Sequence, residues 1–170
     1  MPAAPTKRTA AAAPVFRVSE WPIAHFARIE RQHQLNAARV LAPHGLQHRE
    51  WRMLAILDEV GISAVTALAE RAVIERSTIG KLLVRLEAKG LVMRVAAGGD
   101  TRTNPVKLTA AGRTLLTKSV ESIRQLFEQY QRDMTSADFS ALMKLTAQFR
   151  RGVERVAALQ KSKRRGTENE

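Results

Sequence analysis

The residues from 75 to 89 place hydrogen-bonding and cationic side chains on one side of an expected helix. The apolar residues of this segment recur every three or four positions and predict its buried face: Ile79, Leu82, Leu83 and Leu86. The outward side is left with short polar residues and cations: Ser77, Thr78, Gly80, Lys81 and Arg85. Small side chains permit close approach to a DNA major groove, where Lys and Arg meet bases or phosphates. An ordinary solvated helix face is the alternative interpretation.

The charge of the surrounding segment favours the nucleic-acid interpretation. Residues 70–107 hold eight Lys and Arg, among them Arg94, against four Asp and Glu. Asp100 and Arg102 fall in the polar, Gly-rich stretch 96–104 between two expected strands, which is typical of a projecting hairpin. An arginine at such a tip is placed to enter a minor groove, with the aspartate holding its side chain. A loop that serves only solubility is the alternative.

The composition of the whole chain narrows its class of partner. Its 170 residues carry 28 Lys and Arg against 16 Asp and Glu, a formal charge of +12, which suits nucleic acid or an anionic membrane surface. The cations do not gather on one basic amphipathic helix, which speaks against the membrane surface. The chain has no cysteine, which excludes disulfides, thiolate nucleophiles and Cys-ligated zinc and fits the reducing cytoplasm. We expect a cytoplasmic protein.

The elements that must position these residues follow from apolar spacing and from the Gly and Pro breaks. Helices are expected over 19–41 (capped by Ser19), 47–60, 64–72 (capped by Ser63), 75–89, 110–134 (capped by Thr109) and, after a capping box at Thr135 and Asp138, up to 160. Strands are expected over 91–95 and 105–108. The order predicts a mainly α protein with a small β-hairpin wing, that is, a winged helix-turn-helix between flanking helices.

This order divides the chain into five expected regions. They are a disordered N-terminal tail (1–18), the N-terminal helix of a dimerisation domain (19–44), a winged helix-turn-helix DNA-binding domain (45–108), C-terminal dimerisation helices (109–160) and a flexible, basic C-terminal tail (161–170). The tail either adds affinity for phosphates or has no function.

Several joined motifs carry a family resemblance. They are Gly45-Leu46, Trp51-Arg52-Met53-Leu54, Leu68-Ala69-Glu70, Arg76-Ser77-Thr78-Ile79, Arg85-Leu86-Glu87-Ala88-Lys89-Gly90-Leu91-Val92, the Asp-x-Arg wing and Leu108-Thr109-Ala110-Ala111-Gly112. In order and spacing they resemble the MarR (multiple antibiotic resistance regulator) family of transcription factors. One departure is Thr101, which stands where the wing of the family often has arginine.

The resemblance implies a homodimer that binds pseudo-palindromic double-stranded DNA through one winged domain per subunit. It places Ser77, Thr78, Lys81 and Arg85 on the recognition helix and Arg102 at the wing tip. The full set of expected DNA contacts is Arg76, Ser77, Thr78, Gly80, Lys81, Arg85, Arg94, Asp100 and Arg102.

Two apolar rows in the last helices predict the dimer independently. The first is Leu116, Val120, Ile123, Phe127, Tyr130 and Met134, and the second is Leu142, Leu145, Phe149, Val153, Val156 and Leu159. Both have the spacing of helix-packing faces. A hairpin of the two helices within one chain is the alternative, but so much apolar surface needs further cover.

The four histidines fall close together in the sequence: His25, His33, His44 and His48. A zinc site is one interpretation, although no cysteine or paired carboxylate supports it, and we expect neither metal nor cofactor. Helix-packing histidines are the second interpretation. A ligand pocket is the third, with flat apolar walls and polar or cationic groups from Trp21, His25, Arg28, His48 and Trp51. Such a set suits a small aromatic carboxylate or its CoA thioester.

Three classes of function were weighed. The sequence has no Gly-rich phosphate loop, nucleophile elbow or metal-spaced cluster, so we do not expect an enzyme. The resemblance favours a repressor released by an aromatic ligand, most like family members that control aromatic catabolism. The alternative is an architectural DNA-binding protein with little sequence preference and no ligand.

Overall fold

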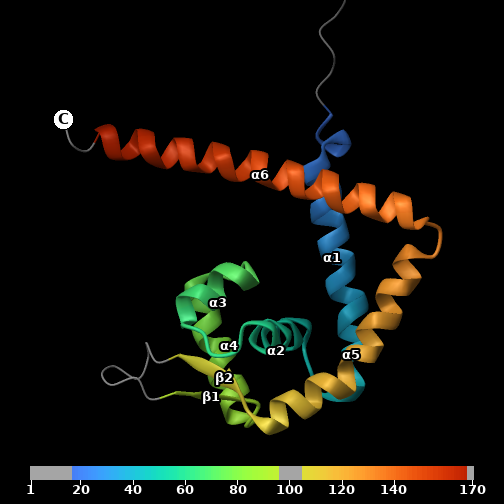
Figure 1. The fold of residues 1–170 in the computed structure, drawn as a ribbon, viewed down its shortest axis with the longest axis vertical. Coiled ribbons are helices and arrows are strands. Elements are labelled where there is room, and N and C mark those ends of the chain that lie inside the picture. Colours follow the sequence, from blue (N-terminus) through green and yellow to red (C-terminus); the bar gives the residue numbers. More distant parts are fainter. Residues whose placement is uncertain (1–16, 96–104, 168–170) are drawn as a thin grey trace, which may run out of the picture.

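The computed structural model describes residues 17–95 and 105–167 (Figure 1). The described part is mostly helical, with one two-stranded antiparallel sheet. Its elements in chain order are η1 (Val18–Glu20), α1 (Pro22–Leu41), η2 (Ala42–His44), α2 (His48–Val60), α3 (Val65–Ala72), α4 (Arg76–Ala88), β1 (Val92–Arg94), β2 (Val106–Leu108), α5 (Ala110–Gln131) and α6 (Ser136–Thr167). The predicted fold class, mainly α with a small β-hairpin, is confirmed.

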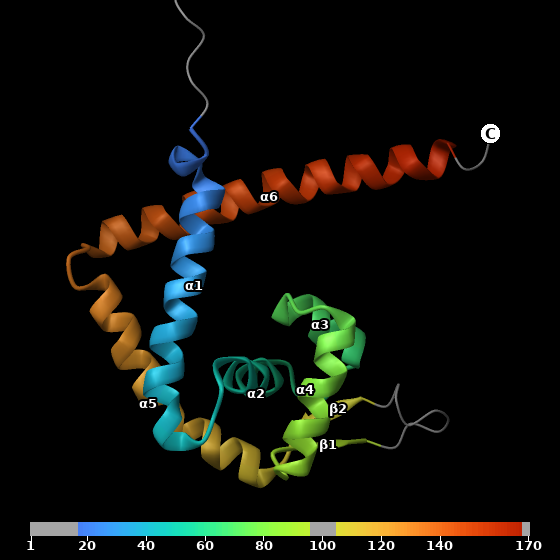
Figure 2. The same ribbon diagram turned by 180° about the vertical axis from the view of Figure 1, so that it is seen from behind.

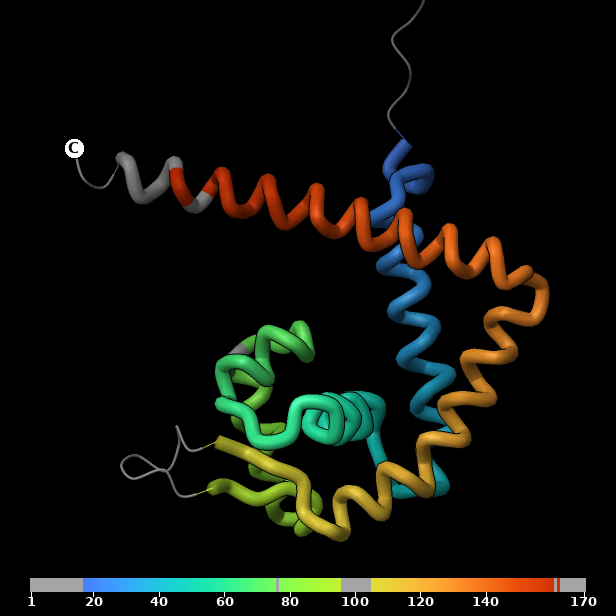
Figure 3. Tube along the Cα trace, viewed as in Figure 1, coloured from blue at the N-terminus to red at the C-terminus, as the bar shows by residue number. Residues whose placement is uncertain are grey.

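One apolar core joins the end of α1 to the helix-turn-helix and the sheet. Its fully buried members include Leu41, Leu54, Leu68, Ile79, Leu83 and Val106. The sheet pairs Val92 with Leu108, and the backbone of Ser63 adds two hydrogen bonds to Val106. The loop between α2 and α3 is thereby tied to β2. Figure 3 traces the chain from α4 through the two strands into α5.

The start of α5 is fixed to the turn between α4 and β1. The Thr109 hydroxyl donates to the carbonyl of Gly90 (2.7 Å) and accepts from the amide of Gly112 (3.0 Å), so the predicted cap is confirmed. A Cβ on Gly112 would come within 2.0 Å of the Leu91 carbonyl oxygen. Only glycine therefore permits this close approach of α5 to the winged region.

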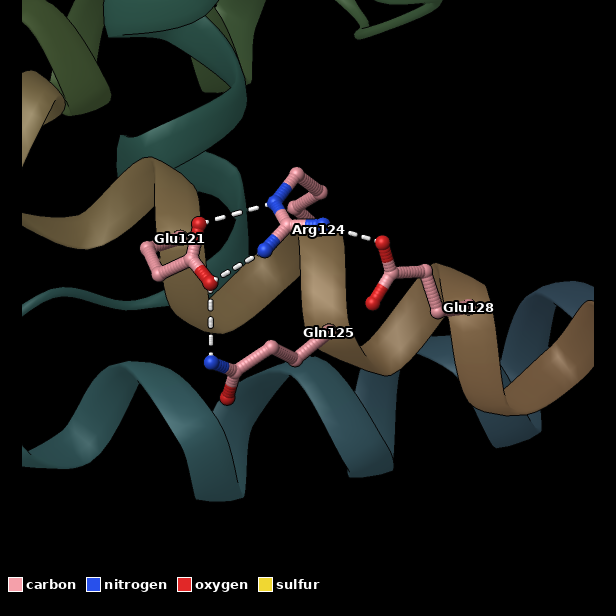
Figure 4. A network of polar contacts seen from close by, with 4 residues as sticks. All are labelled: Glu121, Arg124, Gln125 and Glu128. Atoms are coloured by element: carbon pink, nitrogen blue, oxygen red, sulfur yellow. Dashed lines mark hydrogen bonds and ion pairs between the residues drawn. The ribbon is translucent and has the colours of Figure 1, made fainter.

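The flanking helices extend away from this core. α1 and α5 lie side by side, and α6 crosses α1 at the end remote from the sheet (Figures 1 and 2). On the surface of α5, Arg124 bonds to Glu121 and Glu128, and Gln125 also donates to Glu121 at 2.8 Å (Figure 4). These donors lower the pKa of the Glu121 carboxyl. Such neighbouring charges support an exposed helix.

Two predicted helix caps are wrong. Ser19 lies in η1, and α1 starts at Pro22 after Trp21 without a side-chain cap. Proline suits this first position because it has no amide hydrogen to leave unpaired. Ser63 does not cap α3, because Ala64 takes the capping position, while the backbone N–H and C=O of Ser63 pair with Val106 at 3.0 and 2.8 Å. That pairing makes Ser63 an extension of the sheet.

The last helix starts as predicted and ends later. Thr135 and Asp138 form the expected capping box, with the Asp138 carboxylate accepting from the Thr135 amide at 3.0 Å and the Thr135 hydroxyl accepting from the Asp138 amide at 3.2 Å. The Thr135 hydroxyl and amide both donate to the Asp138 carboxylate and lower its pKa. α6 then continues to Thr167 instead of ending at 160, because no Gly or Pro lies between Gly152 and Gly166. Residues 161–167, expected in a tail, are helical.

Neither described segment of the chain, 17–95 or 105–167, contains a helix with the length and apolar character needed to cross a bilayer.

Candidate nucleic-acid interface

The exposed side of α4 carries most of the residues predicted to contact DNA. The apolar stripe of α4 is buried in the core, which fixes the rotation of the helix about its axis. Ser77, Lys81 and Arg85 lie exposed on the other side, with Thr78 and Gly80 half-buried beside them. The Arg76 side chain is outside the described residues. The structure thus gathers these side chains on one surface, and their contact with DNA stays a prediction.

The turn that leads into α4 contains an unusual backbone conformation. Val73, which ends α3, has φ 52° and ψ 48°, in the left-handed region. Its amide still reaches the carbonyl of Glu70, and the amide of Ile74 reaches that of Ala69. A β-branched residue is strained in this region, so the packing of α3 and α4 holds Val73 against its own preference. No pattern in the sequence indicates this conformation, because a glycine is the usual residue there.

An ion pair between an exposed lysine and a buried carboxylate holds the other end of α4. The Lys89 ammonium donates to both oxygens of Glu50 (3.0 and 2.9 Å) and to the carbonyl of Gly45 (3.1 Å). Glu50 is only 1% exposed, and its carboxylate also accepts from the backbone amide of Gln47. These bonds tie the end of α4 to the start of α2. Sequence analysis missed this pair because 39 residues separate its members.

The base of the wing is stabilised by a second ion pair. Arg94 on β1 lies half-buried, 3.1 Å from the carboxylate of Glu87 on α4. This contact joins the wing to the recognition helix and engages the guanidinium predicted to contact DNA. Asp100 and Arg102, the predicted residues of the wing tip, lie outside the described residues.

The five residues predicted to bind a ligand are not gathered in one place. Trp21, His25 and Arg28 are exposed on or before the first turns of α1, whereas His48 is buried and Trp51 is half-buried against the core. Trp21 precedes His33, the α1 residue that touches His48, by twelve residues, or about 18 Å of helix. The set is divided in two: Trp21, His25 and Arg28 follow one another at the start of α1, and His48 and Trp51 lie one turn apart on α2.

The structure surrounds His48 with residues that sequence analysis had not grouped. The ring of His33 packs edge-on against the His48 ring at 4.8 Å and lies 3.4 Å from the hydroxyl of Tyr130, which accepts from Asn36. Phe127 packs on the other side of His33 at 5.5 Å. Burial, followed by the nearby charge of His33, lowers the pKa of His48. This shift favours the neutral form of His48.

Two side-chain nitrogens in this region lack partners. Across the described residues, Nδ1 of His48 and Nε1 of Trp51 are the buried side-chain polar atoms without a hydrogen bond. An unpaired buried polar group is costly, so such atoms commonly meet ordered water or a ligand. Both residues belong to the predicted ligand set. They are the members of that set that have an unpaired buried nitrogen to offer a ligand.

Cavities lie on either side of the His33–His48 pair. A polar cavity of about 190 Å³ is bordered by α1, α2 and the turn into α4, through Glu30, His48, Arg49, Arg52 and Thr78 among others. Arg52 lies 3.9 Å from Glu30 across it. An apolar cavity of about 580 Å³ lies between α1, α5 and α6, with walls that include His33, Phe127, Tyr130 and Phe139. Of these two cavities, the polar one borders the turn that leads into α4.

The histidines form no metal site in the described part of the chain, because no three His, Asp or Glu side chains there are grouped to hold an ion. His44 instead lies 3.1 Å from the Ser122 hydroxyl on α5.

Comparison with known proteins supplies the family. A sequence model described as the MarR family matches residues 44–103, which include the helix-turn-helix. The transcriptional regulator HosA of Escherichia coli is 33% identical over 93 residues, 55% of this chain and 68% of HosA. The chain belongs to the MarR family. The homoprotocatechuate degradative operon repressor of Escherichia coli is 29% identical over 110 residues, 65% of this chain and 74% of the repressor.

Solved MarR structures share the fold. The regulator MosR of M. tuberculosis, determined in complex with DNA, is 28% identical, with a TM-score of 0.67 over 79% of this chain and 97% of MosR. The MarR-family resemblance predicted from the motifs is thereby confirmed. As a MarR-family protein, the chain is a DNA-binding transcriptional regulator and not an enzyme.

Proposed function

We propose that this MarR-family protein is a homodimeric, cytoplasmic repressor of a pseudo-palindromic operator and that a small aromatic carboxylate or its CoA thioester releases it. The observation that carries the proposal is the exposed face of α4, where Ser77, Lys81 and Arg85 lie together above a fully buried apolar stripe. The sign of regulation is supported by the name of the related homoprotocatechuate operon repressor.

Exposed apolar residues on α6 support the homodimer. The predicted row on this helix remains open to solvent: Leu142, Leu145, Phe149, Val153, Val156 and Leu159. α6 turns away from α5 after residue 135 (Figure 1), so a hairpin within one chain does not cover this row. A large apolar surface on one chain favours a partner, and the same surface on a second copy is the simplest self-complementary cover.

The polar cavity is the proposed effector site. Arg49, Arg52 and His48 offer donors for a carboxylate, whereas the larger apolar cavity has no Lys or Arg in its wall. The unpaired Nδ1 of His48 gives a ligand or water a further partner. Because the cavity also borders Val73 and Thr78, an occupant that prefers another spacing between α2 and this turn would shift α4.

The proposal is tested by fluorescence anisotropy with labelled DNA from upstream of the gene that encodes the chain. Full-length protein is titrated at about 0.15 M salt with excess random competitor, since phosphate contacts alone weaken steeply with salt. Competitor-resistant binding that one aromatic acid or CoA thioester reverses is the expected result. If random DNA competes as well as the upstream DNA itself, the protein is architectural. If binding is specific but no compound reverses it, the effector part of the proposal is wrong.

A pair of variants locates the effector. Arg49→Ala should abolish release by the acid while leaving affinity for DNA unchanged, and Arg31→Ala, an exposed cation on α1 that does not border the cavity, should behave as wild type. Loss of release in Tyr130→Phe, with Arg49→Ala unaffected, would instead place the effector in the apolar cavity.

A further inference from the structure

An apolar side chain stands among the polar residues on the exposed face of α4. Val84 is 60% exposed, although valine is a weaker helix former than most polar residues. Gly80, Val84 and Ala88 are spaced four apart and form one strip along the helix, here called the small strip. Ser77, Lys81 and Arg85, also four apart, form the adjacent cationic strip. Residues at this spacing lie one above another on a helix surface.

The neighbours of Val84 leave its methyl groups free to project. Gly80 has no side chain and Ala88 has a single methyl, so nothing longer stands before or after Val84 on its strip. No heavy atom lies within 4 Å of the position that a Cβ on Gly80 would occupy, which leaves open space beside the strip. The small strip is therefore a narrow apolar surface with Lys81 and Arg85 along one side.

Only one group on the major-groove edges of the four DNA bases matches an isopropyl group chemically. This group is the C5-methyl of thymine, since the other exposed atoms are hydrogen-bond donors and acceptors. We infer that Val84 is a specificity-determining residue that contacts a thymine methyl in each half of the operator, while the cationic strip contacts phosphates or guanine. The inference rests on the proposed function, because it requires α4 to enter the major groove of a specific site.

The test removes the thymine methyl without changing base pairing. The full-length protein first selects its preferred duplex from a random-sequence pool, and each thymine of that duplex is then replaced by uracil. With wild type, replacing the contacted thymine in one half-site should weaken binding about four-fold, the value expected for loss of one buried methyl-sized group, and replacing it in both half-sites about sixteen-fold. Val84→Ala, which alters both subunits, should bind the thymine duplex about sixteen-fold more weakly and lose nothing further on uracil.

Lys81→Ala is the matched control on the neighbouring strip. It should weaken binding to the thymine and uracil duplexes by the same factor and keep the wild-type ratio between them. The inference is overturned if Val84→Ala retains the wild-type thymine-to-uracil ratio, or if no uracil replacement affects wild type although the selected duplex binds specifically. Failure to enrich any sequence from the pool would overturn the proposed function and this inference together. Circular dichroism checks that Val84→Ala remains folded.

Discussion

The winged region and α6 have similar apolar spacing, but the apolar residues of the winged region are buried and those of α6 are exposed. On α4, Ile79 and Leu83 have no exposed surface, and their helix is held in the core by α2, α3 and the sheet. On α6, Leu145 is 63% exposed and Leu159 is 58% exposed. Apolar spacing therefore identifies the face of a helix that is to be covered, but it does not identify the element that covers it. The winged region is covered within the chain, and the proposed cover for α6 is a second copy of the chain.

The largest expected effect comes from placing a charge on the open α6 face. Leu145→Asp should convert the protein to a monomer and weaken operator binding at least about a hundred-fold, because each monomer then holds a single half-site. Analytical ultracentrifugation and anisotropy measure the two effects, and Leu145→Met should preserve both. An unchanged mass for Leu145→Asp would show that this face is not the interface, and the contrast with α4 would need another explanation.

The next effect concerns the ion pair within the winged region. Lys89→Met leaves the buried Glu50 carboxylate without its cation, and we expect a loss of about 2 kcal/mol in the free energy of unfolding. Urea titration at fixed protein concentration measures it. Lys118→Met, at an exposed position of α5, should cost little. Equal free energies of unfolding for the two variants would mean that the Lys89–Glu50 ion pair does not stabilise the winged region.

A smaller and opposite effect is expected in the turn before α4. Val73 is 82% exposed and has a left-handed φ, so Val73→Gly should relieve strain at little cost in packing and stabilise the protein by about 1 kcal/mol. Val84→Gly, at a valine that is also exposed (60%) but has regular helical backbone, should destabilise it by about the same amount. Thermal unfolding compares them. Destabilisation by both substitutions would argue against strain at Val73.

The smallest effect is the dependence of stability on pH that comes from His48, where α2 packs against α1. Burial lowers the pKa of His48 from its ordinary 6.5, with His33 and the nearby arginines adding to the shift and Glu30 opposing it. The unfolded chain therefore takes up a proton before the folded chain does. Stability from this group is complete above pH 6.5 and falls as pH drops below that value toward the lower folded pKa.

His48→Gln removes this titration. The loss of stability between pH 7.5 and 5.5, measured by urea unfolding, should be smaller in His48→Gln than in wild type. His25→Gln, which alters an exposed histidine on α1, should keep the wild-type difference. Identical pH profiles for wild type and His48→Gln would exclude His48 as their source.

The sequence predicted the buried and outward faces of α4 better than it predicted which residues of the ligand set lie together. The stripe Ile79, Leu82, Leu83 and Leu86 lies on a single helix, so its period alone determined which residues face outward. The ligand set grouped residues by type and by nearness in sequence, and Trp21 proved to be far along α1 from His48. His33 and Tyr130, which do meet, are 97 residues apart. No local pattern reports such a pair.

By itself, the sequence determined the order of elements, the winged fold class, the family and the outward face of α4. These depend on local periodicity, capping and turn residues, which act within a few positions. The tertiary structure alone decided that Glu50 meets Lys89, that Val73 adopts a left-handed conformation and that His48 is buried against His33. Each depends on how whole helices are oriented, and that orientation is set by the summed packing of the core rather than by any one segment.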